Sequence, residues 1–181
     1  MSNNQHSVSK SYKSVTEVNK SRIEKLLKNQ HLPYRKISSD SVIMYMASGV
    51  GVMLRDETEL HTEFIVSISK ETGNVCMDFI IIPEVNREQM KEILVGVNVI
   101  NSLIMDQKLV YEFNGNQVVL IDSLHTAYAE VNYSYLEHCF SVILESLVHV
   151  KLALEMFLAG EITADQIPYI LAQEKEGLFV V

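Results

Sequence analysis

Residues 63–69 alternate between apolar and polar side chains, with the period of two that is typical of a β-strand. Residues 75–82 repeat the alternation, and the intervening Thr72-Gly73-Asn74 is typical of a tight turn. The pattern predicts a hairpin over residues 63–82, with one buried side on each strand. The predicted buried residues are Phe64, Val66, Ile68, Val75, Met77, Phe79 and Ile81.

Apolar residues also recur at helical spacing in several stretches. The predicted helices cover residues 14–32, 86–106, 134–159 and 163–173. Ser14, Asn86 and Ser134 are the expected N-caps of the first three, because a Glu or Gln follows each of them three residues later. Gly160 is the expected stop of the third helix. Gly96 costs helix stability, and we expect it to let the second helix approach the sheet closely.

Shorter apolar runs predict the remaining strands. Residues 41–47 form one strand, and residues 52–54 are a candidate for another beyond the two glycines that interrupt the run. A second hairpin over residues 109–121 is expected to turn at Asn114-Gly115, where both central residues would take a positive φ.

The order of these elements predicts one α+β domain with a mostly antiparallel sheet flanked by helices, in the order α-β(3-4)-α-β(2)-α. The domain is expected over residues 14–160. Residues 1–13 are polar and predicted to form a mobile N-terminal arm, and residues 161–181 a C-terminal extension with the short helix. The tail over residues 178–181 is apolar, so we expect it to dock on the body or on a partner.

Composition narrows the classes of protein to which the chain can belong. Hydrophobic residues make up 48% and the net charge is -8, which excludes disorder over the whole chain and argues against a general nucleic-acid binder. The longest aliphatic run, Ile80-Ile81-Ile82, is far too short for a membrane helix. Two cysteines do not make a disulfide framework. The expected location is therefore the cytoplasm, with no binding to membrane or nucleic acid.

The charge is unevenly distributed. Residues 1–40 hold eight Lys and Arg against three Asp and Glu, whereas the remainder holds seven against twenty. One interpretation is a solvated basic helix at the start of the chain. The other is a basic arm that docks on the acidic body of a second copy.

No familiar catalytic pattern is present in the sequence. It contains no P-loop, dinucleotide fingerprint, Gly-x-Ser-x-Gly elbow, Cys-x-x-Cys pair or His-Glu-x-x-His helix. His138 and Cys139 are adjacent, and neighbours on a helix point about 100° apart, so they would not share a ligand. We therefore predict a protein that is not an enzyme and that uses neither a metal nor a cofactor.

Asn98 and Asn101 lie three residues apart in the second predicted helix and so share one side of it. One interpretation is that these amides satisfy free backbone groups of a neighbouring strand or turn. The alternative is a small-ligand or enzyme site assembled from scattered polar residues, for which Asn98, Asn101, Tyr111 and His125 are the candidates.

The third predicted helix has more apolar positions than one buried stripe requires. Its main stripe consists of Leu136, Phe140, Ile143, Leu147, Val150, Leu154 and Phe157. A second file consists of Leu144, Val148, Leu152 and Met156. Because leftover apolar surface usually marks an interface, the second file predicts contact with a protein partner, with a homodimer as the simplest case.

Two segments resemble the YbjN family, whose fold is related to that of type III secretion chaperones. The first is Val97-Asn98-Val99-Ile100-Asn101 followed by Lys108-Leu109-Val110-Tyr111-Glu112-Phe113, and the second is Val118-Val119-Leu120-Ile121 followed by the long helix. The resemblance spans residues 15–159. It implies a small bacterial cytoplasmic protein without catalysis, described in that family as a regulator. The similar chaperones dimerise and hold extended client segments against apolar sheet surface.

Overall fold

The computed structural model describes residues 4–53, 59–124, 126, 128–172 and 179–180. Six strands form one antiparallel sheet in the order β1-β2-β3-β4-β6-β5. The strands are β1 (Tyr34–Ser38), β2 (Val42–Met53), β3 (Glu59–Ser69), β4 (Val75–Ile82), β5 (Lys108–Glu112) and β6 (Gln117–Leu124). A short β7 (Phe179–Val180) pairs with β2, so the described part of the apolar tail docks on the body, which is one of the two expected sites.

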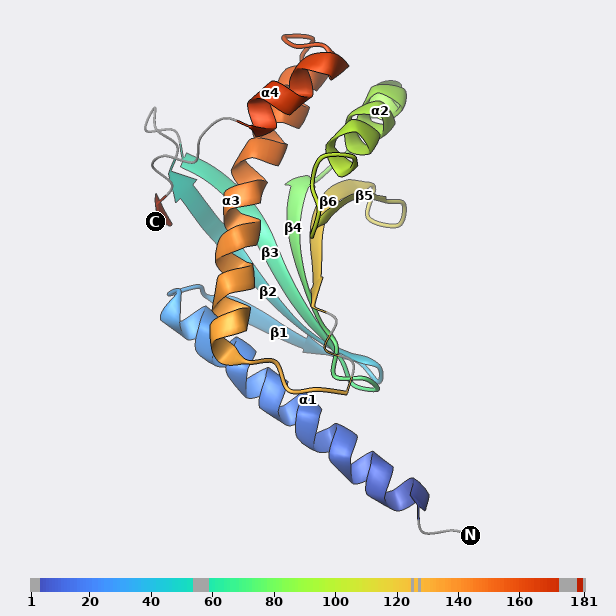
Figure 1. Ribbon diagram of the computed structural model, residues 1–181, viewed down its shortest axis with the longest axis vertical. Coiled ribbons are helices and arrows are strands. Elements are labelled where there is room, and N and C mark those ends of the chain that lie inside the picture. The colour runs from blue at the N-terminus through green and yellow to red at the C-terminus, as the bar shows by residue number, and fades with distance from the viewer. Residues whose placement is uncertain (1–3, 54–58, 125, 127, 173–178, 181) are drawn as a thin grey trace.

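The helices are α1 (Asn4–Asn29), α2 (Met90–Asn101), α3 (Tyr133–Leu158) and α4 (Ile167–Leu171), with short 3₁₀ turns at Arg87–Gln89 and Ala164–Gln166. Helix α3 crosses the sheet, α1 runs beneath its lower end and α2 stands beside its upper end (Figure 1). Helices α1, α2 and α4 all contact α3. The four described helices therefore form one layer on a single face of the sheet.

Aromatic rings fasten α3 to this face. The rings of Phe64 on β3 and Phe79 on β4 stack at 4.5 Å, and the Phe140 ring of α3 lies 5.1 Å from that of Phe64. All three are essentially buried, and so is Tyr45 on β2. Aromatic pairs in this geometry contribute about 1 kcal/mol beyond the apolar area they bury, so the cluster stabilises the contact between helix and sheet.

The 63–82 hairpin and its buried side are confirmed. Strands β3 and β4 pair antiparallel, and every residue predicted to face the core is buried. The sequence missed β1, whose five residues are all exposed and so lack a periodic pattern. The predicted strand 41–47 and the described part of the predicted strand 52–54 belong to one strand, β2. A β-bulge between Ala47 and Val50 lets β2 continue past the glycines at which the sequence pattern breaks.

Several predicted helix ends are wrong. Helix α1 begins at Asn4 rather than Ser14, because residues 4–13 contain neither Gly nor Pro and a nucleated helix propagates through them. The N-cap of α3 is Asn132, whose side chain accepts hydrogen bonds from the amides of the first turn, and Ser134 lies inside the helix. Asn86 does cap the turn before α2, but α2 ends at Asn101 rather than near residue 106.

Two glycine predictions need correction as well. A Cβ at Gly96 would lie 2.8 Å from Leu154 Cδ1, so this glycine brings α2 close to α3 and not to the sheet. The β5–β6 connection is a four-residue loop in which Asn116 carries the positive φ, rather than a two-residue Asn-Gly turn. Gly160 takes a positive φ at the end of α3, as predicted.

The C-terminal extension is part of the body as far as it is described. Thr163 and Gln166 form a capping box, and Pro168 lies in the first turn of α4, where its missing N–H is harmless. Ile167 is fully buried in the same core cluster as the sheet and α3.

Asn19 ties α1 to two distant segments. Its fully buried amide donates to the carbonyl oxygens of Gly73 (2.9 Å) and Ala129 (3.3 Å) and accepts from the Val131 N–H (2.8 Å). The neighbouring Arg22 donates to the Val131 carbonyl. Since residues 129–131 lead into α3, these bonds fix α1 relative to both the sheet and the long helix.

Replacing Asn19 by Ala should lower the free energy of unfolding by about 2–4 kcal/mol, because the two carbonyls and the N–H become buried without partners. Urea denaturation followed by circular dichroism measures this. Asn98→Ala, at an exposed position of α2, is the matched control and should change stability by less than about 0.5 kcal/mol. Equal effects of the two substitutions would contradict the conclusion that the hydrogen bonds of Asn19 hold α1 in place.

Candidate interaction surface

The sheet has a second face, opposite to α3, which we call the open face. Residues that pair across two strands lie on the same face of the sheet, whereas consecutive residues of one strand lie on opposite faces. The buried core residues and their cross-strand partners therefore lie on the helix side, and the residues next to them in sequence lie on the open face. None of the helices in the described part of the chain covers it. Its apolar side chains are Ile37, Met44, Met46, Ile65, Ile80, Val110, Val119 and Ile121. Ile37 and Val110 are exposed, Val119 is buried between its neighbours, and the others are half-buried.

The strand register aligns one row of side chains across the full width of the open face. In sheet order from β1 to β5 the row is Arg35, Met46, Ile65, Asp78, Ile121 and Lys108. A basic residue therefore stands at each end, an acidic residue stands in the interior, and the positions between them are apolar. We call this row the central row.

Asp78 is a carboxylate surrounded by apolar neighbours. Ile65 and Ile121 flank it on the adjacent strands, and the Cys76 thiol donates to its Oδ1 at 3.2 Å. Burial raises the pKa of Asp78, the hydrogen bond from Cys76 opposes this rise, and the charge of Glu112 adds to it. The ionised form is therefore held at a cost in free energy.

The two cysteine thiols are held in the protonated form. Burial, and then the charge of Asp78, raises the pKa of Cys76 to about 12. Burial also raises the pKa of Cys139, although a hydrogen bond with Tyr135 opposes the shift. Because the thiolate is the nucleophile, neither group is activated for covalent chemistry.

Arg35 lies on the open face rather than turning away from it. Its Nη2 is 3.6 Å from the sulfur of Met46, the next residue of the central row, and the side chain is exposed. A guanidinium that rests on apolar surface with its donors in water is ready to accept a carboxylate from outside.

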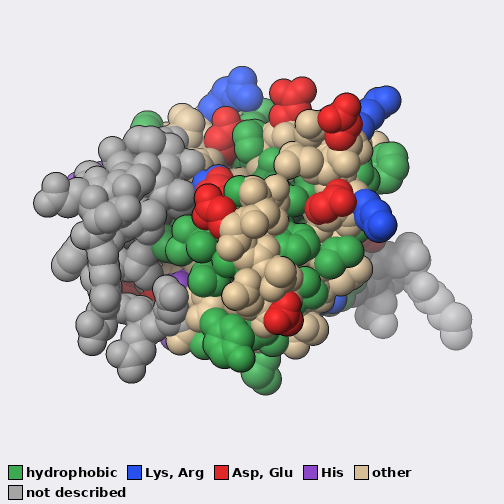
Figure 2. Space-filling view, turned by 90° about the horizontal axis from the view of Figure 1, so that it is seen from above, with side chains coloured by type: hydrophobic (Ala, Val, Ile, Leu, Met, Phe, Trp, Pro, Cys, Tyr) green, Lys and Arg blue, Asp and Glu red, His purple; other side chains and the backbone are tan. Residues whose placement is uncertain are grey.

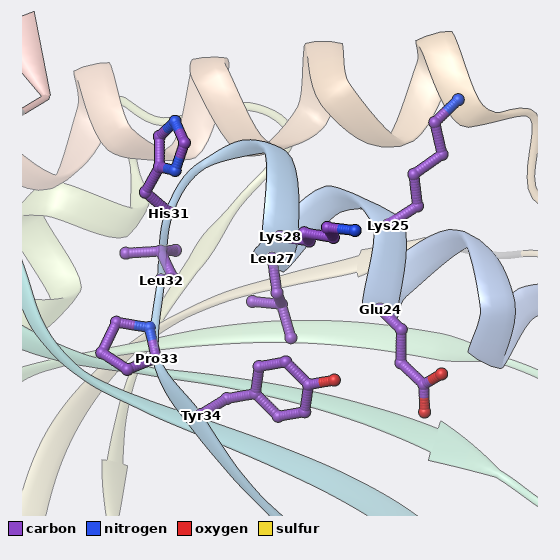
Figure 3. Close-up of a pocket in the computed structure, with 8 residues that line it drawn as sticks. All are labelled: Glu24, Lys25, Leu27, Lys28, His31, Leu32, Pro33 and Tyr34. Atoms are coloured by element: carbon purple, nitrogen blue, oxygen red, sulfur yellow. The ribbon is translucent and has the colours of Figure 1, made fainter.

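A hollow of about 960 Å³ lies between the end of α1 and β1 (Figure 3). Leu27, Leu32, Pro33 and Tyr34 supply its apolar walls, and Glu24, Lys25, Lys28 and His31 the charged or titratable ones. Two of these charges are engaged within the chain. Glu24 accepts from the Tyr45 hydroxyl (2.9 Å) and from Lys36 (3.0 Å), and Lys25 lies 4.1 Å over the Tyr133 ring. The hollow is thus built by contacts that hold α1 on the sheet.

His31 ends α1 in the left-handed conformation, with a φ of 54°. The Leu32 N–H donates to the Leu27 carbonyl and the His31 N–H to that of Lys28, which is the Schellman pattern. Glycine is the usual residue at this position because a Cβ is strained there.

The structure describes three of the four proposed polar site residues, and two of these have their polar groups engaged within the chain. The structural interpretation of Asn101 is confirmed. Its side-chain nitrogen donates to the Leu109 carbonyl and its side-chain oxygen accepts from the Leu109 N–H, each at 2.7 Å. The Tyr111 hydroxyl donates to Asn116. Asn98 is exposed on α2, and His125 lies outside the described residues.

The second apolar file of α3 divides into two parts. Leu144 and Val148 are buried in the core of the chain itself. Leu152 is 37% exposed and Met156 is half-buried, so only this end of the file is available to a partner. Viewed from the end that carries α2 and α4, the surface shows apolar side chains interspersed with acidic ones (Figure 2).

The sequence did not identify the open face, because residues from different strands are brought together there only by the pairing of those strands. The signal that could have found it is Asp78, a lone acid at an alternating position of β4, but its neighbours on the face are set by the register of other strands.

Comparison with known proteins gives no relative: no family model, no curated protein and no solved structure matches this chain. Among the described residues, no helix has the length and apolar character needed to cross a membrane. The same part of the chain holds no group of three or more His, Cys, Asp or Glu side chains arranged to bind a metal ion.

Replacing His31 by Gly should raise the free energy of unfolding by about 0.5–1 kcal/mol, because Gly relieves the strain at positive φ. Gln30→Gly, one residue earlier and at negative φ, should lower it by a similar amount. Thermal or urea denaturation of both variants measures the difference. A destabilised His31→Gly variant would show that contacts of the imidazole stabilise the chain by more than the backbone strain at His31 destabilises it.

Replacing Asp78 by Asn should stabilise the chain at pH 7, by about 1 kcal/mol, because the neutral amide avoids the cost of keeping a partly buried carboxylate ionised. The pKa of Asp78 is raised by folding, so the wild type regains this stability as the pH falls through that pKa. The two proteins should therefore converge in acid. Denaturation at submicromolar concentration, from pH 7 to 3.5, tests this, and a gap that widens in acid would contradict it.

Proposed function

We propose that this chain is a non-catalytic protein-binding module, of a chaperone-like or regulatory kind, which holds a protein partner against the open face. The observation that carries the proposal is the open face itself, where apolar side chains from all six strands lie outside the helical layer. Contiguous apolar surface that stays partly exposed on a stable domain is typical of protein interaction sites, and all the apolar side chains of this face except Val119 are exposed or half-buried.

The chemistry of the described side chains supports a binding role over a catalytic one. The Cys76 and Cys139 thiols have raised pKa values, and the polar groups of Asn101 and Tyr111 are used within the chain. The order of the elements, with four strands before α2 and two after it, supports the proposed relation to the YbjN family and to type III secretion chaperones. A bacterial cytoplasmic location is part of the same proposal.

The open face is a better binding surface than the β1 edge of the sheet. Edge strand β1 follows Pro33 and carries Arg35 and Lys36, the residue types that protect edges from pairing with other chains. The open face has no comparable protection at its centre, where Ile65 and Ile121 flank Asp78.

Site-specific photocrosslinking tests the proposal. A benzophenone amino acid at Ile65, in the full chain expressed in its native cell, should form adducts with a protein partner on irradiation. The matched control is the same residue at Leu94, which is 44% exposed on α2, on the helical side of the molecule. Adducts from Leu94 but not from Ile65 would contradict the proposal.

A further inference from the structure

We propose that the open face is closed by a second copy of this chain, docked face to face so that Arg35 of each copy lies against Asp78 of the other. This inference rests on the proposed function, because it takes the open face as the binding surface and names its occupant. It goes beyond that function by specifying the partner, the register and the charge pair that sets it.

The need for a counter-charge follows from Asp78. Covering the face removes the remaining water from a carboxylate whose described neighbours on the face are Ile65, Ile121 and the Cys76 thiol, with Glu112 adding like charge. A buried carboxylate without a cation is strongly unfavourable. A partner that covers the open face while Asp78 stays ionised must therefore bring a cation to it.

The central row supplies that cation at a matching position. Arg35, Met46, Ile65 and Asp78 stand on four consecutive strands. A two-fold axis parallel to the strands and midway between β2 and β3 places β1 over the partner's β4 and β2 over the partner's β3. Arg35 then faces the Asp78 carboxylate of the second copy, Met46 faces the second Ile65, and the symmetry makes every contact twice.

The dimensions of packed sheets allow this contact. Facing sheets lie about 10 Å apart, a gap that an arginine and an aspartate side chain span together. Strands of two aligned sheets cross at about 30°. Strands β1 and β4 each lie about 7 Å from the two-fold axis, so this crossing angle shifts Arg35 relative to the facing Asp78 by about 4 Å, which the arginine side chain can reach across. Four overlapping strands form a small interface, so we expect a dimer that dissociates in the micromolar range.

Other registers of the same dimer are less favourable. An axis between β3 and β4 would set Arg35 against Lys108 of the second copy, a repulsive pair. An axis along β6 would pair Asp78 with the second Lys108, but it would overlap three strands only and leave Met46 and Ile65 uncovered. Lys108 is therefore the residue that separates the proposed register from its nearest alternative.

Charge reversal tests the proposal on the full chain, by light scattering after size exclusion at 5–200 µM (roughly the range in which interfaces of this size dissociate). Wild type should dimerise. Asp78→Arg and Arg35→Asp alone should each be monomeric, with at least a tenfold weaker association, because each juxtaposes like charges. An equimolar mixture of the two variants should form a heterodimer, since one contact is then the unchanged Arg35–Asp78 pair and the other is the same pair with its charges reversed.

Two controls keep the result interpretable. Lys108→Asp should dimerise as wild type does, and its loss of dimer would select the alternative register and overturn this one. Circular dichroism must show that the monomeric variants are folded, and the rescued mixture shows it independently. A wild type that stays monomeric, single variants that still dimerise, or a mixture that does not associate would each overturn the proposal.

Failure of this inference is distinguishable from failure of the proposed function. A monomeric wild type whose Ile65 position still crosslinks to a different protein would overturn the second copy and retain the binding surface. Absence of any adduct from Ile65 would overturn both.

Discussion

The structure depends on the packing of one helix across one face of the sheet. Phe140 of α3 lies on the stacked rings of Phe64 and Phe79, and the other described helices all contact α3, while α1 and α2 also contact the same sheet at β3 and β5. Because side chains alternate along a strand, every residue that enters this core commits its neighbours to the opposite face. A single helical layer on a six-stranded sheet therefore leaves an open face as its geometric consequence.

Asn19 shows how the layer is held in place. Its amide joins α1 to the β3–β4 turn at Gly73 and to the segment before α3 at Val131. Three segments far apart in the sequence thus meet at one buried side chain. The satisfied hydrogen bonds favour a single arrangement of α1, since any shift would leave buried polar groups unpaired.

The sequence predicted those parts of the fold whose signals are local. The alternation of residues 63–82 identified both strands and their buried side, and the apolar spacing of residues 134–159 identified α3. Ends determined by tertiary contact were not predicted. Gly96 was assigned to the sheet because the sequence cannot show that Leu154 lies against it, and strand β1 has no pattern because all its residues are exposed.

The candidate surface was beyond the sequence for a related reason. Arg35 and Asp78 are 43 positions apart along the chain, and only the pairing of four strands places them in one row. The file on α3 was visible as a pattern, but whether Leu144 was core or interface depended on the neighbours that the fold supplies. Periodicity reveals surplus apolar residues, and the register decides which of them remain outside.

An acidic side chain in an apolar surface has different effects in the free chain and in a complex. In the free chain Asp78 keeps the face from being uniformly apolar, at a cost in stability that a leucine would not impose. In a complex the same carboxylate rejects every partner that does not present a cation at the right strand. Apolar contact between sheets tolerates sliding by one strand, whereas a charge pair does not, so in the proposed dimer the stability lost at Asp78 would provide specificity of register.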